Sequence, residues 1–275
     1  MENMERTDET DALDRRQYLK LSGTAGIAVT GLAGCLESSG SDSPDPDDEN
    51  VIVPGTAAGF PPFEMKRGSD LVGFDIDLLE AIVGETEYEL AEWKDQGFDG
   101  LPPALKDGKI DVIAAAMTIN EKRQESFDFT DPYHSADQAI LVQSGGDFQP
   151  ESLADLEGTT VGAQSGTTGA VLVKDDLIAA GLIAESDFNS YDNYVLATEE
   201  LESGTIDAVV LDDPVAETFA SERDVEVAFV QETGEEFGFA VRPDDDDLLE
   251  ALNEGLAAVR ESGKYDEISE EWFSG

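Results

Sequence analysis

Residues 206–220 read IDAVVLDDPVAETFA, and this short stretch contains one repeating unit of the fold. The apolar run Ala208 to Leu211 has the length and hydrophobicity of a buried strand. Two aspartates and a proline follow, and the apolar residues from Pro214 to Ala220 then recur at helical spacing. The stretch therefore predicts a buried strand that leads, through Asp212 and Asp213, into a helix.

The same alternation continues on both sides of this unit. In a first series we expect strands at Val51 to Val53, Tyr88 to Trp93, Asp111 to Ala116 and Gln138 to Gln143, and helices at Phe74 to Val83 and Leu101 to Leu105. In a second series we expect strands at Thr160 to Gln164, Val225 to Val230 and Phe237 to Val241, and helices at Thr168 to Ala180, Tyr191 to Leu201, Asp246 to Glu261 and Tyr265 to Phe273. Strands that alternate with helices predict α/β sheets rich in parallel pairs, and the two series predict two lobes.

Charge excludes one class of partner. The 275 residues include 63 Asp and Glu against 16 Lys and Arg, a formal net charge of -47. Such a chain repels phosphate backbones, so we expect no nucleic-acid partner. Its hydrophobic fraction of 40% is too high for a disordered polyanion. We therefore expect an acidic surface on a folded protein that works in concentrated salt, where the repulsion is screened.

The single cysteine and the single histidine exclude several kinds of site. One Cys makes no intramolecular disulfide, and no Cys/His cluster exists for zinc, so we expect neither a metal nor a cofactor. A Ser-His-Asp triad would have to use His134. The neighbouring sequence offers that residue no catalytic partner, and we interpret it as a polar residue in a loop after Asp131-Pro132-Tyr133.

Residues 1–34 have the features of an export signal. Arg15-Arg16 precedes a weakly apolar run from Leu21 to Gly34 that is too short to span a bilayer, and the pair resembles a twin-arginine signal. The segment Leu32-Ala33-Gly34-Cys35 resembles a lipobox, which makes Cys35 the expected lipidation site; the alternative is an amphipathic helix with an accidental cysteine. Residues 35–50 are rich in Ser, Pro and Asp, which predicts a flexible acidic tether to the membrane. A single lipid chain anchors only marginally, so a second contact is expected.

Several short motifs follow one another in a fixed order along the rest of the chain. They are Pro61-Pro62-Phe63-Glu64, Gly73-Phe74-Asp75-Ile76-Asp77-Leu78, Phe98-Asp99-Gly100-Leu101, Met117-Thr118-Ile119-Asn120-Glu121-Lys122-Arg123, Phe127-Asp128-Phe129-Thr130-Asp131-Pro132-Tyr133, Ser165-Gly166-Thr167-Thr168-Gly169, Ile206-Asp207-Ala208-Val209 and Gly263-Lys264-Tyr265-Asp266. Each motif is weak alone, but the ordered series over residues 51–273 resembles the family 3 extracellular solute-binding proteins, the polar-amino-acid receptors of ABC importers. Together with the acidic composition, the resemblance implies a lipoprotein of a halophilic archaeon.

The resemblance implies a fold and a role. The fold is a two-lobe periplasmic-binding-protein-like one (type II), with lobe 1 from residues 51–139 and 240–275 and lobe 2 from residues 144–235. Two hinge strands, Gln138 to Gln143 and Phe237 to Val241, would join the lobes, with the ligand in the cleft between them. The implied role is Venus-flytrap capture of a free amino acid and delivery to a membrane permease with its ATPase. We expect a monomer on the extracellular face of the membrane.

The resemblance also implies which residues bind the ligand. Arg123 would clamp the carboxylate, because a guanidinium makes bidentate contacts, with further donors from Thr118 and the Ser165 to Thr168 turn. Asp212, with Asp213 as the neighbouring alternative, would bind the ammonium, together with the Ala116 carbonyl and the Thr118 hydroxyl. The ten expected ligand-binding residues are Phe60, Phe98, Ala116, Thr118, Arg123, Gln164, Ser165, Thr167, Thr168 and Asp212, of which Phe60 and Phe98 would be the aromatic walls.

Specificity and chemistry remain open between alternatives. Ala57, Leu211 and Gln164 provide no counter-charge for a cationic side chain, which favours a neutral ligand, although Glu64 and His134 could reach the pocket. The main alternative function is an exported cyclic-acid dehydratase on the same scaffold, which would need an acid/base pair in the cleft. A sensor domain would need a transmembrane helix, and no stretch beyond the leader is long enough for one.

Overall fold

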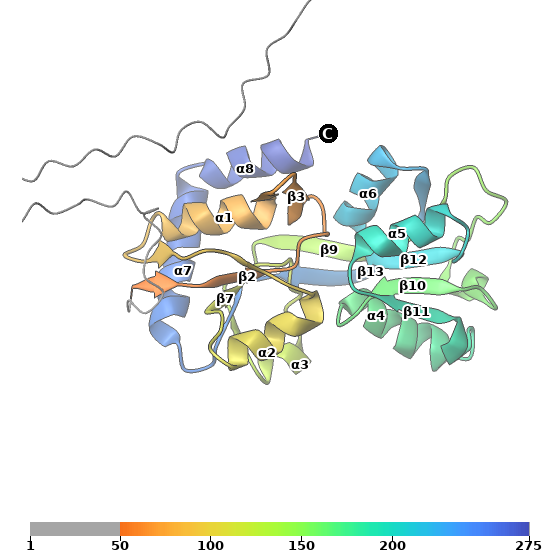
Figure 1. The fold of residues 1–275 in the computed structure, drawn as a ribbon, viewed down its shortest axis with the longest axis horizontal. Helices are drawn as coiled ribbons and strands as arrows, with labels where there is room; N and C mark the ends of the chain where they lie inside the picture. Colours follow the sequence, from red (N-terminus) through yellow and green to blue (C-terminus); the bar gives the residue numbers. More distant parts are fainter. Residues whose placement is uncertain (1–49, 275) are drawn as a thin grey trace, which may run out of the picture. The chain divides into compact units, whose positions relative to one another are not determined.

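Two five-stranded sheets, one in each of two lobes, organise residues 50–274, the part of the chain that the computed structural model describes (Figure 1). The proposed export signal, Cys35 and the spacer up to Glu49 lie outside the described residues. The two-lobe α/β architecture predicted from the sequence is confirmed.

The sheet of lobe 1 has the strand order β6-β2-β7-β14-β8. β2 is parallel to β6 and β7, whereas β14 is antiparallel to both β7 and β8. The bounds are β2 (Pro54–Thr56), β6 (Lys94–Asp95), β7 (Val112–Ile113), β8 (Asp128–Phe129) and β14 (Ala240–Val241). A strand from near the C-terminus therefore lies in the interior of a sheet that is otherwise built from residues 54–129.

Helices from both ends of the described chain cover this sheet. They are α1 (Phe74–Val83), α2 (Leu101–Lys106), α3 (Glu121–Gln124), α7 (Asp246–Glu261) and α8 (Lys264–Phe273). α7 buries Leu248, Leu252, Leu256 and Val259, which recur at the spacing of one helix face. Figure 1 shows α1 between α7 and α8. The Trp272 indole N–H donates to Asp77 at 2.7 Å, which fastens α8 to α1.

Lobe 2 has the strand order β11-β10-β12-β9-β13. β10 is parallel to β11 and β12, and β9 is antiparallel to β12 and β13. Its elements are β9 (His134–Gln143), β10 (Val161–Gln164), α4 (Thr168–Leu172), a π-helical segment η3 (Val173–Ile178), β11 (Phe188–Tyr191), α5 (Tyr194–Glu202), β12 (Ala208–Asp212), α6 (Asp213–Glu222) and β13 (Val225–Phe237). The strand and helix of the stretch 206–220 are therefore β12 and α6, each close to its predicted bounds.

The lobes are joined where β9 and β13 run side by side out of the lobe 2 sheet (Figure 1). Here His134 pairs with Phe237, Ser135 with Glu236 and Ala136 with Glu235. Gln138 to Leu141 already pair with β12 inside lobe 2, and β14 already lies inside the sheet of lobe 1. The connection therefore falls at residues 134–137 and 235–237, slightly before each predicted hinge strand.

Some local predictions were wrong. The strand expected at Val51 to Val53 is the short β1 (Val51–Ile52), which pairs with β5 (Glu89–Leu90), and a separate strand, β2, begins at Pro54. The helix expected over residues 168–180 changes from α to π geometry after Leu172. Several short elements were not predicted, since most are too short for a periodic pattern. They are the hairpin of β3 (Met65–Arg67) and β4 (Asp70–Val72), the 3-10 turns η1 (Phe98–Gly100), η2 (Leu153–Leu156) and η4 (Glu185–Asp187), and α3, β8 and β11.

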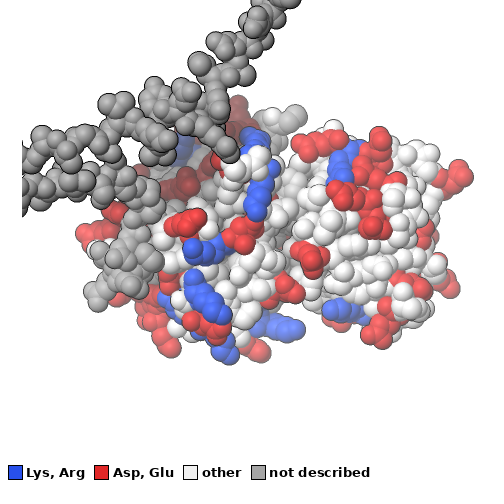
Figure 2. All heavy atoms as spheres, viewed as in Figure 1, with Lys and Arg blue, Asp and Glu red and all other residues white. Residues whose placement is uncertain are grey.

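The surface is acidic on both lobes. Figure 2 shows Asp and Glu spread over the visible face of the two lobes. Within residues 50–274, none of the helices is long and apolar enough to cross a membrane.

Candidate functional site

A cavity lies between the lobes, at the ends of strands from both sheets. Its lining consists of Phe60, Glu64, Phe98, Ala115, Ala116, Thr118, Arg123, Gln164, Thr167, Thr168 and Asp212. Lobe 1 contributes the residues up to Arg123, and lobe 2 contributes the ends of β10 and β12 and the start of α4. The structure therefore brings nine of the ten sequence-predicted binding residues around one space, with Glu64 and Ala115 added.

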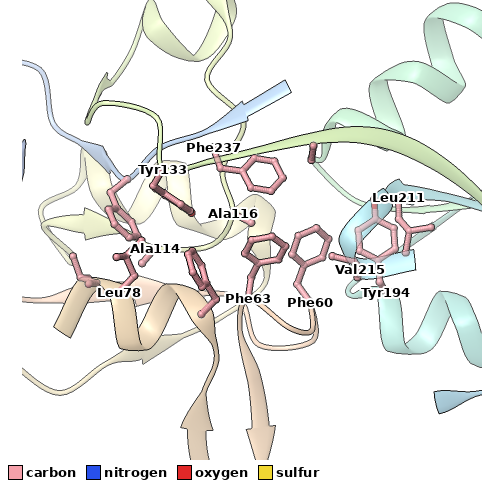
Figure 3. Packing of buried hydrophobic residues seen from close by; sticks show 14 of the residues in the cluster. Phe60, Phe63, Leu78, Ala114, Ala116, Tyr133, Tyr194, Leu211, Val215 and Phe237 are labelled. Atoms are coloured by element: carbon pink, nitrogen blue, oxygen red, sulfur yellow. The ribbon is translucent and has the colours of Figure 1, made fainter. Parts of the chain in front are cut away.

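Aromatic rings form the apolar wall of the cavity. The Phe60 ring lies between Phe63, with a centroid distance of 5.8 Å, and Tyr194 of lobe 2, at 5.5 Å (Figure 3). Phe98 faces the Arg123 guanidinium, whose central carbon lies 5.5 Å from the ring centroid. The flat apolar portion of a ligand would therefore lie against these rings.

Arg123 provides the cationic group of the cavity. Asn120 begins α3, and its side chain accepts the Arg123 backbone N–H at 2.9 Å, which fixes the helical turn that carries the guanidinium. One terminal nitrogen of Arg123 donates to the Thr118 carbonyl at 2.7 Å and the other to the Gly166 carbonyl of lobe 2 at 3.3 Å. Burial lowers the pKa of Arg123, while the neighbouring Asp212 and Glu235 raise it. A guanidinium has five N–H donors, so others are available to a ligand carboxylate.

Two buried carboxylates face the cavity. Asp212 is the last residue of β12, is 5% exposed, and accepts a 3.1 Å hydrogen bond from the Gln138 side chain. Burial and then the charge of Glu235 raise its pKa well above the ordinary value. Glu64 is 1% exposed, and its Oε2 atom has no hydrogen-bond partner. Burial, followed by the charges of Asp75, Asp212 and Asp95, raises the pKa of Glu64 strongly. A cation that enters the cavity would stabilise the ionised form of both carboxyl groups.

The segment that contains Ala116 is held in an unusual conformation. Ala116 has a φ of 44°, in the left-handed region that few non-glycine residues adopt. Its N–H donates to the Asp75 carboxylate at 2.7 Å, and the Tyr133 hydroxyl donates to the same oxygen at 2.6 Å. Asp75 thereby fixes the peptide that forms the floor of the cavity. Burial raises the pKa of Asp75 to about 7, against the effect of these two hydrogen bonds.

The lobe 2 residues of the turn after β10 differ in their contacts. Thr167 caps α4: its hydroxyl accepts from the Ala170 N–H and donates to the Gln164 carbonyl. Thr168 lies 2.9 Å from the Thr118 hydroxyl of lobe 1. Ser165 is the one predicted residue outside the cavity lining, since its hydroxyl donates to Asp99 at 3.2 Å at the rim.

Four residues weighed in the sequence lie elsewhere. Ala57 and Leu211 are buried but do not line the cavity. Asp213 accepts the Asp137 backbone N–H instead. His134 begins strand β9 and is not in a loop as predicted; its ring stacks on Phe273, with centroids 4.8 Å apart. Burial lowers the pKa of His134 to about 4, so it is neutral at physiological pH.

Sequence reasoning missed the supporting residues of the site. Glu235 and Gln138 connect to the cavity residues through Thr118 and Asp212, and Asp75 holds Ala116. In a chain with 63 acids, neither Glu235 nor Asp75 stands out. Only the placement of Asp75 on the buried face of a predicted helix could have marked it, because an acid at such a position needs partners.

Comparison with known proteins identifies the family. The model of the bacterial extracellular solute-binding proteins, family 3, matches residues 52–275. The chain belongs to this family. A probable histidine-binding protein of Campylobacter jejuni is 37% identical over 217 residues, which cover 78% of this chain and 81% of that protein. The arginine-binding extracellular protein ArtP of Bacillus subtilis is 31% identical over 265 residues, which cover 94% of this chain and 99% of that protein.

A solved structure of an ancestral arginine-binding protein bound to arginine has a TM-score of 0.76 and 42% identity, covering 82% of this chain and 98% of that one. As a member of family 3, the chain is an amino-acid-binding component of an ABC importer that works outside the cytoplasm. These relatives are described as binding arginine or histidine, which differs from the neutral ligand expected from the sequence. Of the residues on which that expectation rested, Ala57 and Leu211 do not line the cavity, whereas Gln164 does, together with Glu64.

Proposed function

We propose that this family 3 protein binds a basic amino acid, with arginine as the first candidate. The observation that carries the proposal is the Glu64 carboxylate, which lines the cavity while 1% exposed and keeps one oxygen without a partner. A buried acid without a partner is costly, and a guanidinium or ammonium group on the ligand side chain would supply that partner. The basic amino acids in the names of the relatives support the same ligand class.

In the proposed complex, each ligand group meets its chemical complement. The α-carboxylate binds Arg123 and the turn of Thr167 and Thr168, and the α-ammonium binds Asp212, the Thr118 hydroxyl and the Ala116 carbonyl. The aliphatic part of the side chain lies against Phe60 and Phe98 and points its cationic end toward Glu64. Gln164 supplies a further polar contact. These roles rest on residue chemistry and on the shared cavity.

Closure of the lobes completes the proposed mechanism. The predicted lobes, residues 51–139 with 240–275 and residues 144–235, would move as two bodies, with their boundaries shifted to the connection at residues 134–137 and 235–237 that β9 and β13 make. Contacts between lobes surround the cavity: Thr118 to Thr168 at 2.9 Å, Ser165 to Asp99 at 3.2 Å, and Arg123 to the Gly166 carbonyl at 3.3 Å. A ligand that touches both lobes favours this closed arrangement through its higher affinity for it.

A thermal-shift screen of the twenty amino acids in molar salt tests the ligand class. A ligand at about 1,000 times its Kd stabilises the folded state by about 4 kcal/mol. We expect L-arginine, L-lysine or L-histidine to raise the melting temperature most. A shift with neutral amino acids alone would refute the basic-ligand proposal. Turnover of prephenate or arogenate would instead support the dehydratase alternative.

We further propose that the protein is a monomer on the extracellular face of the cell membrane, tethered through Cys35 and the spacer of residues 35–50. The pair Arg15 and Arg16 would direct export of the folded chain. Cys35→Ser is expected to release the mature protein into the medium or to leave an uncleaved precursor, as fractionation and mass measurement would show. Replacing both arginines by Lys should stop export. Unchanged membrane attachment of the first variant, or normal export of the second, would contradict these assignments.

A further inference from the structure

A fourth buried acid lies behind the cavity, on the strand that joins the lobes. Glu235 of β13 is 6% exposed and pairs with Ala136 where β9 and β13 cross between the lobes. Its Oε2 atom accepts the Thr118 hydroxyl at 2.7 Å. Its Oε1 atom accepts the Gln138 amide at 2.7 Å and the Thr233 hydroxyl at 3.0 Å. Glu235 therefore contacts a cavity residue of lobe 1 and, through Gln138, strand β9.

The hydroxyl hydrogen of Thr118 decides what this residue can offer a ligand. Thr118 has one O–H donor, and Glu235 takes it. The hydrogen bond of 2.9 Å between Thr118 and Thr168 must then be donated by Thr168. Toward the cavity, the Thr118 oxygen can act only as an acceptor. An acceptor suits an ammonium group and not a carboxylate, so Glu235 determines which end of an amino acid Thr118 binds.

Gln138 extends the same arrangement to Asp212. Its Nε2 atom donates both to Glu235 at 2.7 Å and to Asp212 at 3.1 Å, so one amide group holds two carboxylates in place. Gln138 is fully buried, and the two acids are 6% and 5% exposed. The guanidinium of the half-buried Arg123 lies near both acids. The α-ammonium of a ligand would place a second positive charge beside these two carboxyl groups.

A bulge in β13 directs Glu235 inward. The register of β13 against β9 shifts between Gln231 and Glu235. The N–H groups of Thr233 and Gly234 both donate to one oxygen of Asp137, each at 2.7 Å, and Gly234 has a φ of 64°. Such bulges re-aim the side chains next to them. Beyond the bulge, the Ile119 N–H donates to the Glu236 carbonyl at 2.8 Å, which ties the segment of Thr118 to the same strand.

We propose that Glu235 is a positioning residue for the α-ammonium of the ligand. It keeps Thr118 as an acceptor and, through Gln138, holds Asp212, and it thereby links the ammonium site to the strand that joins the lobes. This inference rests on the proposed function, since it assumes that the ligand is an amino acid.

The first test compares Glu235→Gln with a matched control, Glu236→Gln, whose side chain is exposed on the same strand. Binding of whichever of L-arginine, L-lysine and L-histidine the wild type binds most tightly is measured by calorimetry in molar salt. Hydrogen bonds to charged groups contribute about 1.5–3 kcal/mol, so we expect at least a tenfold weakening for Glu235→Gln. The Kd of the Glu236→Gln control should stay within about twofold of the wild-type value, as expected when an exposed charge is removed in high salt. Equal affinities of the wild type and Glu235→Gln would overturn the inference.

The second test separates positioning from general damage. The same ligand without its α-amino group, for example 5-guanidinopentanoate in place of L-arginine, lacks the ammonium that Glu235 would position. We expect Glu235→Gln to weaken binding of this analogue by less than about threefold, within what one lost exposed contact costs. An equal loss for both compounds would show a structural effect and refute the proposed role.

The third test asks whether Glu235 acts through Thr118. In a Thr118→Val background, which removes the hydroxyl from the lobe 1 side, Glu235→Gln should have at most a threefold further effect on amino-acid affinity. A full tenfold effect in that background would show that Glu235 does not act through Thr118 and would overturn that part of the proposal. If the wild type binds no amino acid, the proposed function fails; if it binds one and the variants match it, only the present inference fails.

Discussion

Replacing Glu64 by Gln tests the proposed ligand class most directly, since the change removes a charge and preserves the shape of the side chain. Glu64 is almost fully buried, one of its oxygens has no partner, and its pKa is strongly raised. Loss of a charge-assisted contact with a cationic ligand side chain costs about 2–3 kcal/mol, which corresponds to an increase of about 30- to 150-fold in Kd. We expect this increase for L-arginine.

The ligand-free protein should respond in the opposite direction. A buried carboxyl without a full set of partners destabilises the fold, and an amide of the same size does not need to be ionised. We therefore expect the melting temperature of ligand-free Glu64→Gln to equal or exceed that of the wild type. A lower affinity together with an unchanged or higher stability would exclude misfolding as the cause.

Calorimetric titration with L-arginine and with L-citrulline, its neutral isostere, completes the design. Glu64→Gln should bind L-citrulline at least as tightly as the wild type does, while Glu92→Gln, a change of an exposed acid, should leave both affinities unaltered. Equal losses for the two ligands would show that Glu64 acts on the shape of the cavity. Undiminished affinity for L-arginine would refute its role as a counter-charge.

Three further predictions concern the clamp, the floor of the cavity and the surface. Arg123→Lys keeps the positive charge but loses the planar fork of the guanidinium, so it should weaken ligand binding at least tenfold without unfolding the protein. It should also abolish the ligand-induced compaction that solution scattering measures. Compaction like that of the wild type would contradict the role of Arg123 as the carboxylate clamp. The pKa of Asp75 is raised from 3.8 to about 7, so the folded chain retains a proton that the unfolded chain has lost, and the stability of the wild type should fall as pH rises across that window. Asp75→Asn should remove up to about 1.4 kcal/mol per pH unit of this slope in denaturant titrations, and an unchanged slope would contradict the assignment. Because -47 formal charges are weakly screened in dilute buffer, circular dichroism should show loss of the fold as salt falls below about molar concentration, and a cooperative fold that persists at low salt would exclude dependence on salt.

The parts of the fold that were predictable are those with long periodic patterns. The helices Phe74–Val83 and Asp246–Glu261 begin and end at the predicted residues, because their apolar residues repeat over several turns. The two-residue strands β6 and β8 carry no such signal, since their pairing depends on neighbours far away in the sequence. The change to π geometry after Leu172 was equally invisible, because it alters hydrogen bonding without altering the apolar pattern.

The candidate site, like the fold, was predictable only in part. Arg123, Thr118 and Phe98 lie in motifs whose order suggested a family, Asp212 follows a predicted buried strand, and the structure places all four around the cavity. The specificity argument compared positions in the sequence, whereas the side chain of the ligand would meet whichever residues line the space. Leu211 alternates away from the cavity along β12, while the loop that contains Phe60 turns Glu64 into it. That loop geometry depends on tertiary contacts and has no local signature.

The position of β14 inside the lobe 1 sheet determines the order in which the two halves of the molecule can be completed. All five strands of the lobe 2 sheet have been synthesised once the chain reaches Phe237. The other sheet lacks a central strand until residues 240 and 241 arrive, and its core stays uncovered until α7 and α8 have formed against α1. Domains fold as units during synthesis, and pairing between distant segments is slow. Lobe 2 can therefore fold on the ribosome, whereas lobe 1 waits for the last residues of the chain.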